Sequence, residues 1–151
     1  MPSLVGSEMC IRDSVVPDQP LSTHKARQAI PQHIPHQDAV FNASRTALYV
    51  GALMSGNYQY LNAALEDRLH QPYRIPLITG TEAVFEAAKA NGAYGAIISG
   101  AGSTLMAYAD PEKDCDIIAA AMTDAFEKYG QRSTAHILKL DFNGAREKEH
   151  S

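Results

Sequence analysis

The segment of residues 92–108, GAYGAIISGAGSTLMAY, constrains the fold of this chain more than any other stretch. Two apolar runs flank residues 99–104, SGAGST, in which no side chain is larger than that of threonine. Short apolar runs bounded by turn residues are typical of buried strands. Glycine adopts a positive φ without steric cost and lets another group approach its backbone closely. The segment therefore predicts two strands whose connection presents nearly bare backbone.

The composition is that of one ordinary globular domain. The 151 residues are 45% hydrophobic and 20% charged, with a formal net charge of -4 and no basic cluster, so we expect no nucleic-acid partner. No apolar run approaches the ~18 residues of a membrane helix, and the opening residues lack the apolar region of a signal peptide. Cys10 and Cys115 lack metal-ligand spacing, which favours a cytoplasmic protein without a disulfide framework or zinc site.

The two ends of the chain are expected to lie outside the domain. Residues 1–14, MPSLVGSEMCIRDS, follow neither the helix nor the strand period and predict a disordered leader. The EMCIRDS part resembles translated sequencing adapter at the edge of an assembled fragment; the alternative is a flexible natural terminus. Residues 144–151 are expected to form a solvated tail, which leaves residues 15–143 as the domain.

A short strand at residues 15–16 and three helical segments, the last at residues 57–67, are predicted in the first half of the domain. Ser22 or Thr23 can cap a short helix that Pro31 ends. A longer helix ends at Gly56, and we expect it to be mostly buried. Its apolar stripe consists of Val40, Ala43, Ala47, Val50 and Met54, widened by Phe41, Leu48 and Leu53.

The second half of the domain predicts further helices and strands. Pro72 and Pro76 exclude a regular helix from their segment. Thr79 and Glu82 have the spacing of a capping box, and the helix that they open closes at residues 91–92, Asn-Gly. Residues 110–112, Asp-Pro-Glu, open another helix, and residues 133–142 form a last strand. The predicted fold is α+β, a small antiparallel or mixed sheet covered by helices on one face.

Two interpretations of the glycine connection stay open on its residues alone. Gly100 and Gly102 suit a tight hairpin turn, and they also suit an anion-binding nest of successive N–H groups. No Gly-Lys-Ser or Gly-Lys-Thr follows, so the segment is not a P-loop.

The whole segment nevertheless resembles a known signature. It is similar to the third signature of the kinase superfamily named for galactokinase, homoserine kinase, mevalonate kinase and phosphomevalonate kinase. The residues that match are Gly92, Ala93, Gly95, Ala96, Ser99, Gly100, Ala101, Gly102 and Thr104. Ser103 stands where that family usually has proline. The resemblance implies a ferredoxin-like C-terminal domain in which Ser99, Gly100, Ala101, Gly102 and Thr104 lie beside phosphate at the active site.

Two arginine-bearing segments extend the resemblance to homoserine kinases. The guanidinium fork of arginine suits a carboxylate, although each arginine alone could be an ordinary surface charge. Residues 22–27, STHKAR, and residues 66–74, EDRLHQPYR, resemble segments that line the amino-acid site in that family. The resemblance implies that Thr23, Arg27 and Arg74 hold L-homoserine, with both arginines facing its carboxylate. His70 is either a site residue or a residue that orders its loop.

The long helix contributes two further candidates. Its segment AVFNASR resembles the corresponding helix of that family, and it places Asn42 and Arg45 on one helical face. We interpret these two side chains as structural helix contacts.

The resemblance also implies the reaction and its partners. These kinases transfer the γ-phosphoryl group of ATP to homoserine in threonine biosynthesis, with Mg²⁺. Their phosphate loop, similar to Gly-Leu-Gly-Ser-Ser-Ala, belongs to an N-terminal domain, and no such segment occurs here. The chain is therefore expected to be a C-terminal half that lacks its N-terminal domain, is inactive alone and binds neither ATP nor Mg²⁺ tightly. A homodimer is a further candidate assembly.

Two alternatives remain. A free-standing α+β regulatory module could bind an amino acid through the same arginines. A sugar or isoprenoid kinase of the same superfamily is less favoured, because two carboxylate-binding arginines would have no evident task there.

Overall fold

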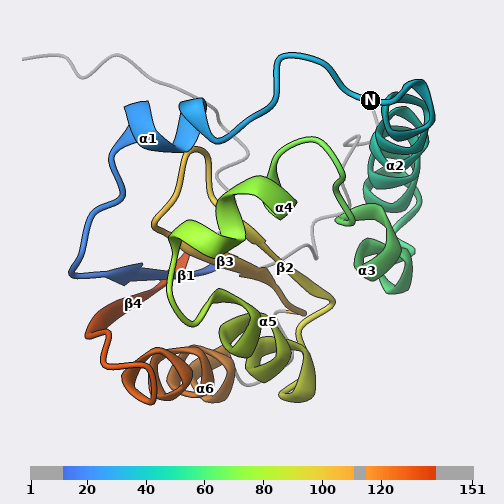
Figure 1. Cartoon of the computed structure of the whole chain (residues 1–151). Helices are drawn as coiled ribbons and strands as arrows, with labels where there is room; N and C mark the ends of the chain where they lie inside the picture. Colours follow the sequence, from blue (N-terminus) through green and yellow to red (C-terminus); the bar gives the residue numbers. More distant parts are fainter. Residues whose placement is uncertain (1–11, 111–114, 139–151) are drawn as a thin grey trace, which may run out of the picture.

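The structure is a computed structural model that describes residues 12–110 and 115–138 (Figure 1). The strands are β1 (Arg12–Pro17), β2 (Gly95–Ile98), β3 (Leu105–Tyr108) and β4 (Ser133–Leu138). The helices are α1 (Thr23–Gln28), α2 (His36–Ser55), α3 (Leu61–Ala64), α4 (Gln71–Arg74), α5 (Thr81–Ala90) and α6 (Cys115–Glu127), with short 3-10 turns η1 (Tyr58–Tyr60) and η2 (Ile75–Leu77).

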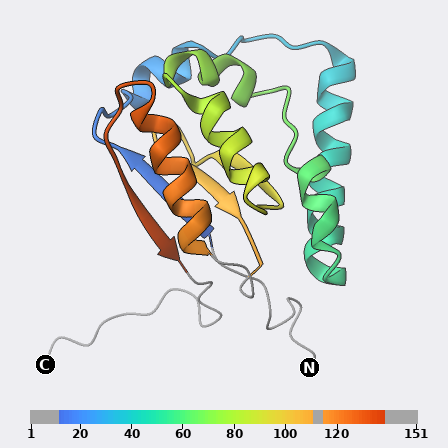
Figure 2. The ribbon, with the colours of Figure 1, turned by 90° about the horizontal axis from the view of Figure 1, so that it is seen from below.

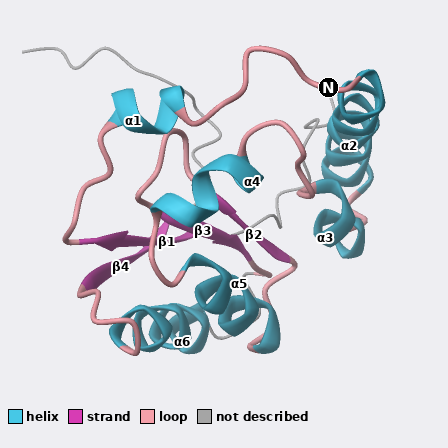
Figure 3. Cartoon of the chain, viewed as in Figure 1, coloured by secondary structure: helices cyan, strands magenta, loops and turns pink. Residues whose placement is uncertain are grey.

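The strands form one antiparallel sheet in the order β2-β3-β1-β4 (Figure 3). In its register, Val15 of β1 lies opposite Leu105 of β3 and Ala135 of β4. The strand pair predicted around the glycine segment is confirmed, as is the α+β fold class. The sheet is antiparallel throughout, so no strand needs a parallel crossover connection.

The start of β1 corrects the predicted leader boundary. The strand begins at Arg12, although residues 12–14 were expected to belong to the leader. These residues have no helix or strand period, but their backbone pairs with β3 on one side and β4 on the other. Ladder hydrogen bonds on both edges hold them in the sheet without an apolar pattern. The rest of the predicted leader and the tail at 144–151 lie outside the described residues.

One face of the sheet packs against α5 and α6 (Figure 2). Strand side chains at alternate positions meet the apolar stripes of the two helices, as the period of two requires. The fully buried members of this core include Val15, Leu105, Val84, Ile118, Met122 and Phe126. Burying a large apolar side chain contributes about 1.5–3 kcal/mol, so this cluster is the main stabilising element of the fold.

A second, smaller cluster attaches α2 and α3 at the β2–β3 side of the sheet (Figure 1). Its buried members are Ala52, Leu61 and Tyr108. Tyr49 of α2 lies edge-on to Tyr108, with 6.2 Å between ring centroids, and their hydroxyls are 3.2 Å apart. Helix α2 is therefore fixed to the end of β3 through one face only.

The prediction that α2 is mostly buried is wrong. Val40, Val50 and Met54 are 55%, 49% and 59% exposed, and Ala52 is the one buried residue of the helix. The helix stands beside the sheet rather than over it (Figure 2), so the face that carries Tyr49 and Ala52 packs and the opposite face does not. The periodicity is real, but the described part of the chain leaves its apolar stripe uncovered.

Two local predictions also need correction. Pro72 lies in the first turn of α4, where the N–H that it lacks has no helical partner to lose, so a short helix does form. The capping box at Thr79 does not form, because Gly80 takes the N-cap position with a φ of +90°. Thr81 instead donates from its hydroxyl to the Ile78 carbonyl at 2.7 Å.

Other boundaries are as expected. Gly56, with a φ of +71°, is the C-cap of α2, and Asn91 is the C-cap of α5, followed by Gly92 with a φ of +101°. The predicted cap of α6 at residues 110–112 and the end of the last strand at 139–142 fall partly or wholly outside the described residues.

The glycine connection forms a hairpin turn between β2 and β3. Ser99 donates its N–H to the Thr104 carbonyl at 2.8 Å, and Gly102 donates to the Ser99 carbonyl at 3.2 Å. Gly100 and Gly102 have φ values of +60° and +93°, as the turn interpretation requires. A Cβ on Gly102 would lie 2.9 Å from the Ile78 side chain, whereas one on Gly100 would meet nothing within 4 Å.

This difference predicts unequal effects of the two alanine substitutions. Gly100→Ala should cost about 1 kcal/mol, the strain of a left-handed alanine. Gly102→Ala adds a steric contact with Ile78 and should cost about 2–3 kcal/mol. Urea unfolding of both variants measures this, and equal losses would contradict the packing role of Gly102.

Candidate functional site

A cavity of about 440 Å³ lies between α2, residues 64–74 and the β2–β3 hairpin. Its polar lining comes from Asn42, Arg45, Glu66, Asp67, His70, Gln71 and Arg74, and its apolar lining includes Tyr49, Ile97 and Tyr108. The size and the mixture of apolar walls with a few convergent polar groups are typical of small-ligand sites. This cavity is the candidate site.

Arg74 connects the cavity to the hairpin. It donates from Nη1 to the carbonyl oxygen of Gly100 at 2.7 Å. Its Nε is buried and has no hydrogen-bond partner. Within residues 12–110 and 115–138, no carboxylate lies within salt-bridge distance of this guanidinium. Among the described residues, the positive charge of Arg74 therefore has only a neutral carbonyl as its partner at the cavity wall.

The other arginine of the cavity is already paired. Arg45 of α2 donates from Nε and Nη2 to Glu66 Oε2, at 3.1 and 2.9 Å. Its guanidinium also lies over the Phe41 ring, 4.2 Å from the centroid. These are the structural helix contacts expected for Arg45, and they leave Arg74 as the cation better suited to an anionic ligand.

Asp67 organises the segment that carries Arg74. Its Oδ1 accepts the N–H of Leu69 at 2.8 Å, and its Oδ2 accepts those of His70 and Gln71 at 2.9 and 2.6 Å. Asn42 adds a side-chain donor at 2.6 Å. The carboxylate thus acts as a cap at the start of α4 and satisfies N–H groups that have no helical partner.

These donors determine the charge state of Asp67. Partial burial works to raise the pKa of its carboxyl group. The hydrogen bonds from the backbone of Gln71 and Leu69, the side chain of Asn42 and the backbone of His70 outweigh that effect and lower the pKa below its ordinary value. Asp67 is therefore a firmly ionised structural anion.

Two amide side chains fix this segment to both walls of the cavity. Asn42 of α2 accepts the N–H of Arg68 on Oδ1 at 2.9 Å, in addition to its bond to Asp67. Gln71 accepts the N–H of Ile98 of β2 on Oε1 at 2.9 Å and donates to the Leu65 carbonyl at 3.3 Å. Residues 65–74 are thus held between α2 and the hairpin.

The predicted site residues are only partly brought together. Arg74, His70 and Gly100 line the same cavity. Ser99, Ala101, Gly102 and Thr104 belong to the hairpin but are not among the residues that line this cavity. Thr23 and Arg27 are exposed on α1 and do not line it either, although α1 lies beside the hairpin (Figure 1).

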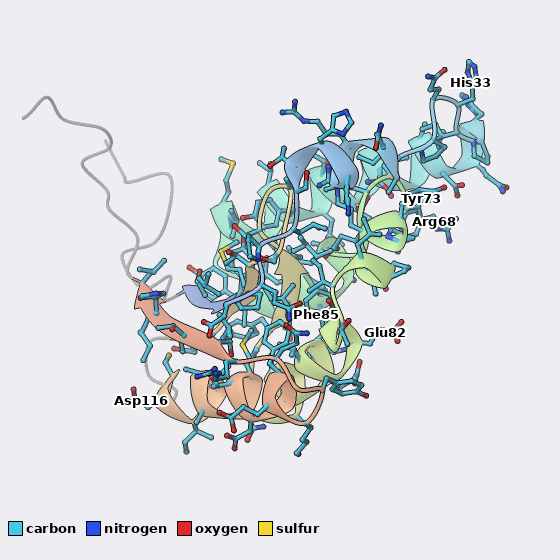
Figure 4. The ribbon with its side chains drawn as sticks, turned by 60° about the vertical axis from the view of Figure 1, so that its left-hand side comes forward. His33, Arg68, Tyr73, Glu82, Phe85 and Asp116 are labelled. Atoms are coloured by element: carbon cyan, nitrogen blue, oxygen red, sulfur yellow. The ribbon has the colours of Figure 1, made fainter. Side chains whose placement is uncertain are left out.

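Some residues of the site were not anticipated from the sequence. Asp67 lies three residues before His70, the N-cap of α4, and aspartate is typical of turns in which a side chain accepts backbone N–H groups a few residues on, so this signal could have identified it. Gln71 and Tyr49 gave no such signal, because their partners Ile98 and Tyr108 lie far away in the sequence. Figure 4 labels Arg68 and Tyr73, which mark the segment and show it above Phe85 of α5.

The described part of the chain has neither a metal-binding cluster nor a membrane-spanning helix. Among residues 12–110 and 115–138, no group of histidine, cysteine, aspartate or glutamate side chains could hold a metal ion. Across those residues, no helix combines the length and the apolar character needed to cross a membrane.

Comparison with known proteins places these features in a family. The sequence model of the family described as "GHMP kinases C terminal" matches residues 49–128. The homoserine kinase of Picosynechococcus sp. is 48% identical over 129 residues, which are 85% of this chain and 42% of that protein. The homoserine kinase of Trichormus variabilis is 45% identical over 130 residues, 86% of this chain and 43% of that protein.

A solved structure agrees with these matches. The crystal structure of homoserine kinase from Cytophaga hutchinsonii has a TM-score of 0.83 and 25% identity, covering 86% of this chain and 41% of that chain. The chain therefore spans about two fifths of the length of the relatives that it matches.

The hydrogen bonds of Asp67 predict a pH-dependent contribution to stability. Asp67→Asn should lower the free energy of unfolding by about 1–2 kcal/mol near neutral pH, because charge-assisted bonds to three backbone donors are lost. Since the folded pKa lies below the unfolded one, this contribution is present above about pH 4 and is lost as the pH falls further. Urea unfolding as a function of pH measures it.

Glu66→Gln is the matched control. Glu66 is the neighbouring carboxylate, and its exposed ion pair with Arg45 should contribute less than about 0.5 kcal/mol. If both substitutions had the same effect at every pH, Asp67 would not be the organising carboxylate.

Proposed function

The chain belongs to the GHMP kinase C-terminal family, and from this premise we propose that it is the C-terminal part of a homoserine kinase. The complete enzyme would phosphorylate the side-chain hydroxyl of L-homoserine with ATP, in threonine biosynthesis in the cytoplasm. The observation that carries this proposal is the Arg74 guanidinium, which lies at the cavity wall with no carboxylate partner in the described residues.

Arg74 is suited to the carboxylate of the substrate. Its Nη1 is committed to the Gly100 carbonyl, so the fork is oriented before a ligand arrives. The remaining N–H groups could bind a carboxylate through charge-assisted hydrogen bonds. A cavity of about 440 Å³ has room for an amino acid of this size. Selection for a carboxylate favours homoserine over a neutral sugar, which has no such group.

The other residues of the predicted site receive supporting roles in this proposal. His70 lines the cavity next to the Asp67 cap, where it could contact the substrate. Thr23 and Arg27 would approach from α1, which lies on the far side of the hairpin from α5 (Figure 1). The hairpin residues Ser99, Gly100, Ala101, Gly102 and Thr104 would form the wall nearest the transferred phosphoryl group.

The described residues do not fit the nucleotide and its metal. They include no cluster of side chains that could hold Mg²⁺, and no phosphate-loop pattern occurs in the sequence. The groups that hold ATP and Mg²⁺ would therefore come from the part of the relatives that this chain does not span, the proposed N-terminal domain.

Substitution of Arg74 tests the substrate assignment. In the complete enzyme, Arg74→Ala should raise KM for homoserine by about 10- to 100-fold, because a charge-assisted pair with the carboxylate is lost. Arg132→Ala, an exposed arginine away from the cavity, is the control and should leave KM unchanged. A coupled ADP-release assay gives both values, and an unchanged KM in Arg74→Ala would refute the assignment.

The 151-residue chain by itself separates the proposal from the regulatory-module alternative. We expect no homoserine-dependent ADP release, and only weak binding in calorimetry, with a Kd above about 1 mM. A Kd for homoserine below about 100 µM would identify a free-standing amino-acid-binding module instead. Turnover of ATP by this chain would show that the nucleotide site is present after all.

A further inference from the structure

We propose that the outward face of α2 is the surface on which the rest of the complete protein docks. This inference rests on the proposed function, because it takes the chain to be part of a longer kinase. The surface, called here the α2 stripe, consists of Val40, Ala43, Ala47, Val50 and Met54.

The α2 stripe is a continuous row and not a set of scattered exposures. Its members follow one another at steps of three and four residues, the spacing by which one helix packs against another element. They lie on the face opposite Tyr49 and Ala52, which hold the helix to the β3 end of the sheet. Single exposed apolar residues are ordinary, but an uninterrupted row along a helix indicates an interaction surface.

The face also lacks charge. In the 20 residues of α2, Asp38 and Arg45 are the only residues of the Asp, Glu, Lys and Arg types, and both face the 65–74 segment, where they pair with Arg68 and Glu66. A helix face that stays in water normally carries charged side chains. The α2 stripe is instead flanked by small uncharged residues such as Ser44 and Gly51. Such a face suits an apolar protein surface as its partner.

The area of the stripe favours a tethered partner over a second copy of the chain. From Val40 to Met54 the helix rises ~21 Å, and it is ~10 Å wide, so the stripe offers roughly 200 Å². A stable dimer buries about 800 Å² on each partner. Domains joined in one polypeptide need less, because tethering supplies a high effective concentration. The relatives have such a tethered part, since over half of each lies outside the matched region.

The position of α2 places the docked part behind one wall of the cavity. Asn42, Arg45 and Tyr49 line the cavity from the inward face of the same helix. A domain seated on the α2 stripe is therefore separated from the cavity by the width of the helix, and the part of it that carries the nucleotide would have to reach the substrate past an end of α2. The helix would serve as the shared wall between the two parts.

Thiol labelling tests this inference. Val50→Cys is prepared in the 151-residue chain and in the complete protein, and modification of the peptide containing residue 50 is followed by mass spectrometry. We expect labelling to be at least about 10-fold slower in the complete protein, because docking restricts access to residue 50. Ile117→Cys on α6, an aliphatic position of similar exposure at 52%, is the matched control and should label equally in both.

Each outcome is decisive. Equal labelling rates of residue 50 in the two proteins overturn the inference. The inference is also overturned if labelling of residue 50 in the 151-residue chain slows as the concentration of that chain rises, because a second copy would then be the occupant. Met54→Cys provides a second reporter if Val50→Cys fails to fold. Homoserine-dependent ADP release by the complete protein is measured in parallel. Turnover without protection refutes only the docking surface, and protection without turnover refutes only the proposed function.

Discussion

The carboxylate of Asp67 is the constraint on which the geometry of the cavity depends. It gathers the N–H groups of Leu69, His70 and Gln71 and thereby starts α4, the short helix that ends with Arg74. Without an anion at this point, the partly buried N–H groups of Leu69 and Gln71 would lack hydrogen-bond partners. The free-energy cost of leaving a buried donor unpaired exceeds what one such hydrogen bond contributes to stability. Asp67 thus positions the segment that carries the Arg74 guanidinium. The Asp67 carboxylate already accepts four hydrogen bonds, so it does not form an ion pair with Arg74.

Helix α2 has two functional faces, and this explains both its sequence and its place in the fold. Its inward face combines polar side chains, which fix residues 65–74, with Tyr49 and Ala52, which pack against the sheet. Its outward face is apolar and uncovered in the described part of the chain. The apolar periodicity of α2 indicates that its outward face packs against something, but it does not tell whether the partner belongs to the described part of the chain. For this reason the periodicity predicted a helix buried within the domain.

The sequence predicted well what depends on local rules. The hairpin, the ends of α2 and α5 and the α+β class follow from glycine conformations, caps and strand composition, which act over a few residues. It predicted less well what depends on long-range contacts. The bond of Gln71 to Ile98, the pairing of Tyr49 with Tyr108 and the strand pairing of Arg12 join segments far apart in the chain. Their residue types carry no signal of their partners.

The two glycines of the hairpin show how one motif combines packing with recognition. Gly102 turns inward, where a side chain would press on Ile78 and Leu21, so its role is to let the hairpin pack. Gly100 faces open space, and its carbonyl receives Arg74. A side chain at residue 100 would strain the backbone, because φ is positive there, but it would meet no neighbouring atom within 4 Å. The bare backbone at Gly100 lies next to a cation that has no carboxylate partner among the described residues. An anionic ligand could therefore approach the backbone and the cation together. A turn that served only to connect the two strands would need neither feature.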